Sequence, residues 1–474
     1  MPRSNPASIS AARRPLLPEP QVMPPLPITQ LEENFADIAP PLTRDAALVE
    51  SSKCLFCHDA PCMIACPTHI DVPSFIKKIA TGNLRGSATV ILDANPMGHS
   101  CARACPVDVL CEGACVLNDR DEEPIKIALL QRYATDYALE KNLRLFEPGP
   151  DNGKKVAIVG AGPAGLSCAQ DLRRMGYAVT IFDAHPVPGG LNTYGIAEYK
   201  MRAPVALAEA KMIIALGVEV KSGVTVGRDI SFEDLRSQYD AVLVAVGLAE
   251  TRRLGIPGED LPGVIDALRF IEHLKTHPYD ATPVGRNVVV VGAGNTAIDA
   301  VTQSKRLGAH SATIVYRRGE EEMPAYEYEY ELAKKDGCDF RFFTVPKRVL
   351  GNHRVTGLEC VRSKMGPPGK DGAQTLVEIP DSTHVIECDM LLRATGQGRN
   401  AELLKSAGIT LQDGKVMTTL PNVFVAGDCL SGGAEIVNAA AEGKHAAADI
   451  NAALGGAVFG GALFAWQRDK LIRA

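Results

Sequence analysis

Eight of the 13 cysteines in this 474-residue chain lie in two short runs, CLFCHDAPCMIACP at 54–67 and CARACPVDVLCEGAC at 101–115. Thiolates packed this densely usually belong to disulfides, zinc sites or iron–sulfur clusters. Disulfides are disfavoured, because nothing at the N-terminus resembles an apolar secretory segment and a reducing compartment is therefore expected. Zinc usually takes paired Cys-x2-Cys motifs or a pair with spaced histidines, and only Cys54 and Cys57 form such a pair. A run that ends in Cys-Pro is the ferredoxin pattern, so iron–sulfur clusters are the favoured interpretation.

Two cubane clusters would need eight ligands, and eight cysteines are present, but the number alone does not show that all of them serve. The gap of four residues before Cys62 also departs from the plain ferredoxin pattern, which has a gap of two. The spacing therefore predicts clusters without assigning each ligand.

Three stretches around these cysteines resemble the N-terminal iron–sulfur domain of dihydropyrimidine dehydrogenase. They are CLFCHDAPCMIACPTHIDVPSFI at 54–76, NPMGHSCARACPVDVLCEGAC at 95–115 and IALLQRYATD at 127–136. The small subunit of bacterial glutamate synthase shares much of this frame. In the dehydrogenase family one cluster is held by four cysteines, and the other by three cysteines and a glutamine. The resemblance implies one 4Fe–4S cluster on Cys54, Cys57, Cys62 and Cys115, a second on Cys66, Cys105, Cys111 and Gln131, and Cys101 as a spare.

Gln131 is the residue that favours one of these two families over the other. It stands in LLQRY, where glutamate synthase small subunits usually carry Glu. Without the matching frame, Gln131 would be taken for an ordinary polar residue of a helix. With that frame, it favours the pyrimidine enzyme.

A complete strand–helix–strand pattern runs from residue 155 to residue 183. Its first strand, VAIVG, leads into a GxGxxG motif, and its second strand, AVTIF, ends next to an acidic residue. In such units the first glycine makes the tight turn, the second lets the backbone approach a pyrophosphate, and the third lets the helix pack close to the strand. The pyrophosphate lies at the helix N-terminus and the acid accepts from a ribose hydroxyl. The residues in these positions are Gly160, Gly162, Gly165 and Asp183.

The next stretch, PGGLNTYGIAEYKM at 188–201, matches the flavin-binding continuation of both enzyme families. The resemblance therefore implies that the first nucleotide is FAD. It also implies that Leu191 and Lys200 line the isoalloxazine, that Asp428 binds the ribitol, and that a helix starting near Ala434 has its N-terminus at the ring.

A second unit, NVVVVGAGNTAIDA at 287–300, is followed by the strand ATIVYRR at 312–318. Ala297 fills the third glycine position, which tolerates alanine. The strand ends in two arginines rather than an acid, and a guanidinium can hold a 2′-phosphate with paired hydrogen bonds. The unit is thus predicted to bind NADP(H), with NAD(H) left open, because NAD-preferring relatives can carry arginine nearby. The predicted binding residues are Gly292, Gly294, Asn295, Thr296, Arg317 and Arg318.

Apolar runs at 239–247 and 389–396 have the pattern of strands buried on both faces of parallel sheets. The predicted fold is α/β, with two Rossmann-like nucleotide-binding domains preceded by a helical iron–sulfur domain. The FAD-binding domain is predicted to be split by the inserted NAD(P)-binding domain. Helical patterns at 73–93 and 124–137 belong to the first domain. The predicted ranges are an extended Pro-rich arm at 1–40, the helical domain with two 4Fe–4S clusters at 41–148, the FAD-binding domain at 149–285 and 397–474, and the NAD(P)-binding domain at 286–396.

The composition fits a globular protein of about three domains. Hydrophobic residues make up 46% and charged residues 22%, and the net charge is −6. No basic tract interleaved with aromatic residues is present, so nucleic acid is not expected as a partner. The longest uncharged run near the end, 450–466, is shorter than the roughly 20 residues of a membrane-spanning helix. We interpret it as a buried helix with a loose tail, and we expect a cytoplasmic protein without a membrane partner.

These parts predict an electron path from nicotinamide through FAD and the clusters to an outside acceptor. Hydride carries two electrons and clusters pass one at a time, so the flavin must stand between them. No general acid or nucleophile is required, and no catalytic residue is predicted. Dithiol reductases of the same fold would need a cysteine pair beside the flavin, but the remaining cysteines are scattered. These are Cys168, Cys338, Cys360, Cys388 and Cys429.

The resemblance implies an electron-input subunit of a two-subunit dihydropyrimidine dehydrogenase, which reduces uracil and thymine to 5,6-dihydropyrimidines. Its expected partner is a catalytic subunit with an FMN barrel and ferredoxin-like clusters. The alternatives are the small subunit of NADPH-dependent glutamate synthase, a reductase for another acceptor, and a scaffold protein with vestigial sites.

Overall fold

The structure is a computed structural model that describes residues 24–368, 374–412, 415–418 and 420–457. The chain forms two compact units. The larger unit comprises Ile38–Thr193, Lys200–Leu248 and Arg399–Ala474, and the smaller unit comprises Met1–Asp37, Tyr194–Tyr199 and Ala249–Gly398. Among the described residues, no helix combines the length and the apolar character needed to cross a membrane.

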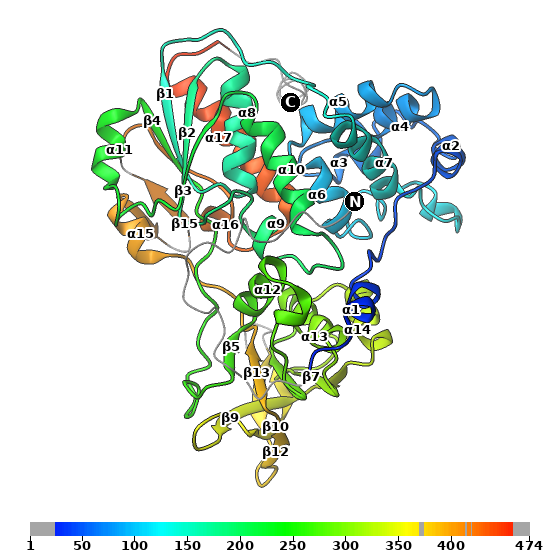
Figure 1. The fold of residues 1–474 in the computed structure, drawn as a ribbon, viewed down its shortest axis with the longest axis vertical. Coiled ribbons are helices and arrows are strands. Elements are labelled where there is room, and N and C mark those ends of the chain that lie inside the picture. Colours follow the sequence, from blue (N-terminus) through cyan, green and yellow to red (C-terminus); the bar gives the residue numbers. More distant parts are fainter. Residues whose placement is uncertain (1–23, 369–373, 413–414, 419, 458–474) are drawn as a thin grey trace. The chain divides into compact units, whose positions relative to one another are not determined.

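The larger unit contains a five-stranded parallel sheet in the order β16-β4-β1-β2-β3 (Figure 1). Residues of β1 and β4 are almost all buried, as expected for strands covered on both faces. Helices α8 and α17 pack closely at Gly443. A Cβ at this position would lie only 2.1 Å from the carbonyl oxygen of Ala164, so the close approach requires glycine there. The strands are β1 (Lys155–Val159), β2 (Ala178–Asp183), β3 (Glu219–Ser222), β4 (Ala241–Val244) and β16 (Val423–Val425). The helices are α8 (Pro163–Arg174), α9 (Leu191–Tyr194), α10 (Ala203–Ile214), α11 (Phe232–Gln238), α15 (Ala401–Ser406), α16 (Asp428–Ser431) and α17 (Ile436–Ala453), and a small antiparallel pair is formed by β14 (Ile409–Gln412) and β15 (Lys415–Thr418).

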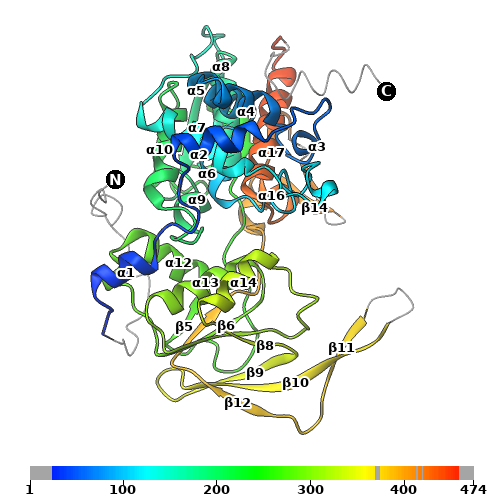
Figure 2. The same cartoon turned by 90° about the vertical axis from the view of Figure 1, so that its right-hand side faces the viewer.

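A helical region precedes this sheet in the same unit (Figure 2). The two cysteine runs lie on α3, on α6 and in the loops next to these helices. The helical pattern at 73–93 is formed by two helices, because Gly82 adopts a positive φ of 77° and the Asn83 side chain caps the second helix. The helix expected at 124–137 begins three residues later. The helices are α2 (Arg44–Ser52), α3 (Pro61–Ile64), α4 (Val72–Ala80), α5 (Leu84–Ala94), α6 (Gly98–Ala104), η2 (Asn118–Arg120) and α7 (Ile127–Glu140).

The smaller unit has its own five-stranded parallel sheet, ordered β5-β13-β6-β7-β8, and an antiparallel layer formed by β9 to β12 (Figure 2). This unit starts at Ala249 rather than at the predicted residue 286, because β5 pairs with β13 and α12 follows β5 directly. The strands are β5 (Val264–Asp266), β6 (Asn287–Val291), β7 (Ser311–Val315), β8 (Asp339–Arg341), β9 (Thr344–Leu350), β10 (Gly357–Pro368), β11 (Gln374–Glu378), β12 (His384–Glu387) and β13 (Met390–Arg393). The helices are α12 (Ala267–Thr276), η3 (Tyr279–Ala281), α13 (Asn295–Arg306) and α14 (Glu327–Lys335).

The N-terminal arm is not wholly extended as predicted. Its residues from 24 onward include helix α1 (Ile28–Asn34), whereas residues 1–23 lie outside the described residues. The helix is anchored within the smaller unit, because Phe35 is fully buried and stacks on Tyr279 with ring centroids 4.7 Å apart. Its terminal residue, Asn34, donates from Nδ2 to the carbonyl oxygen of Arg306 at 2.7 Å. Tertiary packing therefore gives the arm a helix that its prolines did not predict.

The fold class predicted from the sequence is confirmed: a helical cysteine-rich region is followed by two Rossmann-like parallel sheets. Near the C-terminus, α17 ends at Ala453 within the predicted buried run at 450–466, and residues 454–457 are not helical. The rest of that run and the predicted loose tail fall on residues 458–474, which lie outside the described residues.

Candidate cofactor sites

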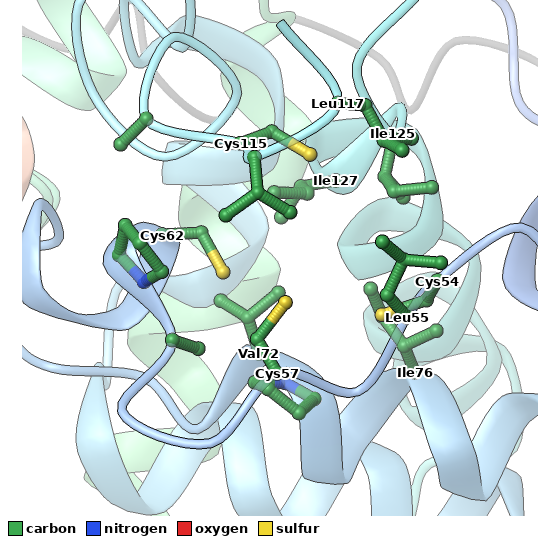
Figure 3. Close-up of a pocket in the computed structure, with 15 residues that line it drawn as sticks. Cys54, Leu55, Cys57, Cys62, Val72, Ile76, Cys115, Leu117, Ile125 and Ile127 are labelled. Carbon is green, nitrogen blue, oxygen red and sulfur yellow. The ribbon is translucent and has the colours of Figure 1, made fainter. Parts of the chain in front are cut away.

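Four cysteines of the helical region line one cavity: Cys54, Cys57, Cys62 and Cys115. Figure 3 shows the sulfur atoms of Cys57, Cys62 and Cys115 turned toward the same space. This is the set that the resemblance assigned to the first cluster. Cys54 and Cys57 lie in the loop before α3, and Cys62 lies on α3, whereas Cys115 belongs to the second cysteine run. The rest of the lining is mainly apolar and includes Leu55, Val72, Ile76, Leu117, Ile125 and Ile127.

The chemistry of this donor set fits an iron–sulfur cluster, since four thiols surround a space rather than a point. Among the described residues, no three His, Cys, Asp or Glu side chains form a group suited to a single metal ion. Burial, together with the neighbouring Cys54 and Cys115, raises the pKa of the Cys62 thiol to about 12. Because thiolates are the ligand form, cluster binding at this cavity must release protons.

A second group of thiols lies on the other cysteine loops. Burial, followed by the effect of Cys66, raises the pKa of Cys111. A hydrogen bond with Cys101, and then burial, raise the pKa of Cys105, to which Cys66 also contributes. Cys66 is part of a hydrophobic core cluster against which Cys105 and Cys111 pack. The predicted second cluster needs these three residues to lie near one another.

Gln131 is buried on α7, and its Nε2 donates to the carbonyl oxygen of Gly98 at 2.8 Å. This bond uses the nitrogen, so Oε1 is the atom that a metal could take. No described contact joins Gln131 to the three cysteines of its predicted set, and its role as a ligand stays a prediction. The sequence analysis leaves Cys101 as a spare; in the structure it is buried on α6, and its Sγ accepts from Asn95 Nδ2 at 3.2 Å.

The three glycines of the first GxGxxG motif have different physical roles. Gly160 has a φ of +110°, and a Cβ there would lie 2.3 Å from the Ala245 carbonyl oxygen. A Cβ on Gly165 would lie 2.0 Å from the carbonyl oxygen of Gly160, so both positions need glycine for the fold itself. Gly162 caps α8 with an ordinary φ of −79°, and its nearest neighbour would be 3.9 Å away. The fold does not require glycine at this position, which leaves the helix N-terminus open to a phosphate.

The other predicted flavin-site residues all lie in the larger unit. Asp183, at the end of β2, accepts from the backbone N–H of Ala161 at 2.6 Å and keeps lone pairs for a ribose hydroxyl. Leu191 is exposed and starts α9, whereas Lys200 is buried. Burial raises the pKa of Asp428, the first residue of α16, to about 6.

The second motif, in the smaller unit, repeats the division of roles among its glycines. Gly292 has a φ of +132°, and a Cβ there would lie 2.2 Å from the Ala394 carbonyl oxygen. Gly294 caps α13 with a φ of −88°, and its nearest neighbour would be 3.9 Å away. Asn295 begins α13, and its Oδ1 accepts from the backbone N–H of Tyr326 at 3.2 Å, while Thr296 stands half-buried beside it. The backbone at these residues is therefore fixed before any ligand binds.

Arg317 and Arg318 follow the end of β7 with exposed side chains. Their backbone is held in place: the carbonyl oxygen of Arg317 accepts from Ser363 Oγ at 2.8 Å, and that of Arg318 accepts from the N–H of Phe343 at 2.9 Å. Two guanidinium groups are thus presented on a fixed strand end, where the ribose of a dinucleotide on this fold is expected.

Alanine at Gly162 or at Gly294 should weaken nucleotide binding without disturbing the fold. The added methyl group meets no protein atom closer than 3.9 Å, but it occupies space next to the helix N-terminus. We expect Gly162→Ala to weaken FAD binding about tenfold, or 1.4 kcal/mol, and Gly294→Ala to raise the KM for NAD(P)H by a similar factor while FAD stays bound. Flavin titration of the apoprotein and steady-state kinetics measure the two effects. Equal FAD affinity in wild type and Gly162→Ala would contradict this assignment.

Comparisons with known proteins agree with this geometry. Residues 154–443 match the family described as pyridine nucleotide-disulphide oxidoreductase, and residues 31–143 match dihydropyrimidine dehydrogenase domain II, 4Fe–4S cluster. The solved structure of Mycobacterium tuberculosis FprA in complex with NADPH has a TM-score of 0.55 at 23% identity, covers 65% of this chain and 85% of that chain, and shows the fold alone. The chain is thus a pyridine nucleotide-disulphide oxidoreductase by fold, with an added 4Fe–4S domain.

Two relatives identify the family more closely. The glutamate synthase [NADPH] small chain of Escherichia coli is 36% identical over 90% of this chain and 95% of that protein. The NADPH-Fe(3+) oxidoreductase subunit beta of Geobacter sulfurreducens is 37% identical over 80% of this chain and 61% of that protein. The chain belongs to the family of the glutamate synthase small chain. It is an NAD(P)-dependent flavin and iron–sulfur oxidoreductase that transfers electrons between NAD(P)H and a partner.

Proposed function

We propose that this chain is the electron-input subunit of a hetero-oligomeric enzyme and that its own residues hold FAD, NAD(P)H and two 4Fe–4S clusters. The observation that carries the proposal is the cavity lined by four cysteine sulfurs in the same unit as the first dinucleotide motif. Bound FAD accepts a hydride and releases electrons singly, which links a nicotinamide to one-electron clusters. The protein's part is to bind and orient these groups: glycine-capped helices for the pyrophosphates and buried thiols for iron.

The comparisons favour a glutamate-forming partner. The similarity to the Escherichia coli small chain extends over 95% of that protein and includes both nucleotide motifs and the cysteine loops. On this proposal, electrons from NADPH reach a partner that converts 2-oxoglutarate and glutamine to glutamate. The interpretation that the sequence ranked second is therefore the better supported of the two.

A pyrimidine-reducing partner is the second candidate, and a specific residue favours it. Gln131 is buried, its Nε2 is fixed on Gly98, and its Oε1 is left for iron, as the glutamine ligand of the dehydrogenase family requires. The match of residues 31–143 to the dihydropyrimidine dehydrogenase cluster domain points the same way. On this proposal the partner is an FMN-barrel subunit with ferredoxin-like clusters, which reduces uracil and thymine.

One experiment separates these partners. The purified chain is mixed with each candidate subunit, and NAD(P)H oxidation is followed at 340 nm. Oxidation that depends on 2-oxoglutarate plus glutamine supports the first partner, and oxidation that depends on uracil or thymine supports the second. NAD(P)H oxidation that requires ferricyanide and does not respond to either set of substrates would support the role in electron input and would reject both partners.

The double variant Arg317→Ala/Arg318→Ala should raise the KM for NADPH by about tenfold to a hundredfold, since charge-assisted hydrogen bonds contribute roughly 1.5–3 kcal/mol each. The KM for NADH should change by less than about twofold, because NADH has no 2′-phosphate for a guanidinium to hold. Ferricyanide reduction by the chain alone measures both constants. The matched control is Arg228→Ala, an exposed arginine paired with Asp229 in the other unit. Equal losses for the two nucleotides would contradict a 2′-phosphate site.

A further inference from the structure

Two exposed arginines, Arg317 and Arg318, follow strand β7, and Glu322 binds the residue on either side of them. The hydroxyl of Tyr316, which precedes the pair, donates to the backbone carbonyl oxygen of Glu322 at 2.7 Å. The backbone N–H of Gly319, which follows the pair, donates to Oε2 of the same glutamate at 3.0 Å. Glu322 therefore bridges the two residues that flank the arginine pair.

The backbone of the two arginines is held by other residues. Their carbonyl oxygens accept from Ser363 Oγ of β10 and from the N–H of Phe343, which precedes β9. Glu322 adds the hydrogen bonds at the two flanking residues, so the whole turn from 316 to 319 is tied to the rest of the smaller unit. Packing at Gly319 is also tight, because a Cβ there would lie 2.7 Å from the Phe343 ring and 2.8 Å from Glu322 Oε2.

The segment 319–326, which carries Glu322, is itself anchored in the smaller unit. Met323 and Ala325 pack against the hydrophobic core of that unit. The backbone N–H of Ala325 donates to the carbonyl oxygen of Ala293 at 3.2 Å, and Ala293 lies between the first two glycines of the second motif. The segment thus joins the arginine turn to the predicted pyrophosphate turn, and Glu322 is held from both ends.

We infer that Glu322 is a positioning residue for the 2′-phosphate of NADP(H), because it fixes the backbone that presents the two guanidinium groups. A long side chain loses conformational freedom when it binds, and a fixed backbone reduces the freedom that remains to be lost. NAD(H) gains nothing from this order, since it has no 2′-phosphate for a guanidinium to hold. The inference rests on the proposed 2′-phosphate site at Arg317 and Arg318, and it assigns part of the discrimination to a residue that acts through them.

The charge of Glu322 predicts the opposite effect from its hydrogen bonds. A carboxylate near a phosphate opposes binding by like-charge repulsion, so removing Glu322 would strengthen NADP(H) binding if charge were its only contribution. If Glu322 holds the arginine turn, its removal weakens NADP(H) binding instead. The sign of the change therefore distinguishes a positioning role from a purely electrostatic one.

The test is calorimetric titration of the oxidised full chain, with its FAD and clusters, with NADP+ and with NAD+. Glu322→Ala should weaken NADP+ binding by about threefold to tenfold, the range that one hydrogen bond contributes, and change NAD+ binding by less than about twofold. Glu322→Gln keeps an acceptor oxygen for the Gly319 N–H, so it should bind NADP+ at least as tightly as the wild type. Tyr316→Phe removes the other hydrogen bond and should weaken NADP+ binding by about twofold to threefold.

Glu321→Ala is the matched control, because it removes the same charge from the exposed neighbour of Glu322 and should not weaken NADP+ binding. Glu322→Ala should also add nothing to Arg317→Ala/Arg318→Ala, since a positioning residue has no effect once the residues it positions are gone. Unchanged or tighter NADP+ binding in Glu322→Ala would overturn the inference, as would equal losses for both nucleotides or a full additional loss in the triple variant. If Glu322→Ala does not fold, Tyr316→Phe decides in the same way. Equal losses in the double arginine variant itself would instead refute the 2′-phosphate site.

Discussion

Replacing Cys62 with alanine should reduce electron delivery from NAD(P)H to the partner by about a hundredfold or more, because a cluster with three thiolates in place of four is not retained in its native form. Cys62 comes from α3 and faces the cavity between the loop of Cys57 and that of Cys115 (Figure 3). Among the described residues, the only other cysteines that line this cavity are Cys54, Cys57 and Cys115, which are the remaining predicted ligands, so no spare thiol is present to replace Cys62. The iron content should fall by about half, since one of two clusters is lost.

The predicted FAD-binding site should be unaffected by the substitution of Cys62. The cavity that Cys62 lines includes no residue of the glycine motifs, and the first sheet is built from different residues. Reduction of FAD by NAD(P)H, followed by stopped-flow absorbance, should therefore keep its wild-type rate while electron delivery to the partner is lost. Cys388→Ala, a buried thiol of the smaller unit, is the control and should leave iron content and both rates unchanged. A full iron content in Cys62→Ala would show that the cavity does not hold a cluster.

The cysteine cavity was only partly predictable from the sequence. The spacing of Cys54, Cys57 and Cys62 predicted a metal site, because ligands close in sequence are necessarily close in space. Cys115 joins them only through the fold of the helical region, and it was assigned by resemblance rather than by spacing. The structure brings all four together, but it leaves Gln131 without a described contact to its predicted set.

The two Rossmann units were predictable because their signals are local: a buried strand, a glycine turn, a helix and a second strand. The motif could not show that the fold requires glycine at Gly160 but not at Gly162. The requirement at Gly160 comes from the carbonyl oxygen of Ala245, which follows β4 and would clash with a Cβ. The start of the smaller unit was missed for the same reason. Strand β5 has only three residues and is recognised by its pairing with β13, which follows it by more than a hundred residues.

Replacing Lys444 with methionine should lower the free energy of unfolding of the larger unit by about 3–5 kcal/mol, the usual cost of breaking a buried ion pair from one side. Lys444 lies on α17 and is 1% exposed, as is its partner, Asp171 of α8, at 2.7 Å. Its Nζ also donates to the carbonyl oxygen of Asp93, at the end of α5, at 2.9 Å. One ammonium group therefore joins the helical cysteine-rich region to two helices that cover the first sheet.

The loss cannot be compensated locally. After the substitution, the one ion-pair partner left to the Asp171 carboxylate among the described residues is Arg174, at 3.6 Å, and that arginine is already paired with Asp93 at 2.7 Å. Urea unfolding of the chain with its cofactors, followed by circular dichroism and by flavin fluorescence, measures the change. The exposed pair of Lys221 and Glu219 in the same unit is the control, where Lys221→Met should cost less than about 1 kcal/mol.

The double variant Lys444→Met/Asp171→Leu distinguishes the loss of the attraction from the cost of leaving a charge buried and unpaired. If most of the cost comes from leaving the carboxylate buried and unpaired, an apolar pair of similar volume should recover most of the 3–5 kcal/mol. If the double variant is as unstable as Lys444→Met, the bond to the Asp93 carbonyl is the larger contribution, and the tie between α17 and α5 matters more than the ion pair. In that case the cysteine-rich region should lose its iron at a lower urea concentration than the one that releases FAD, because the contact that fails first is the one between them.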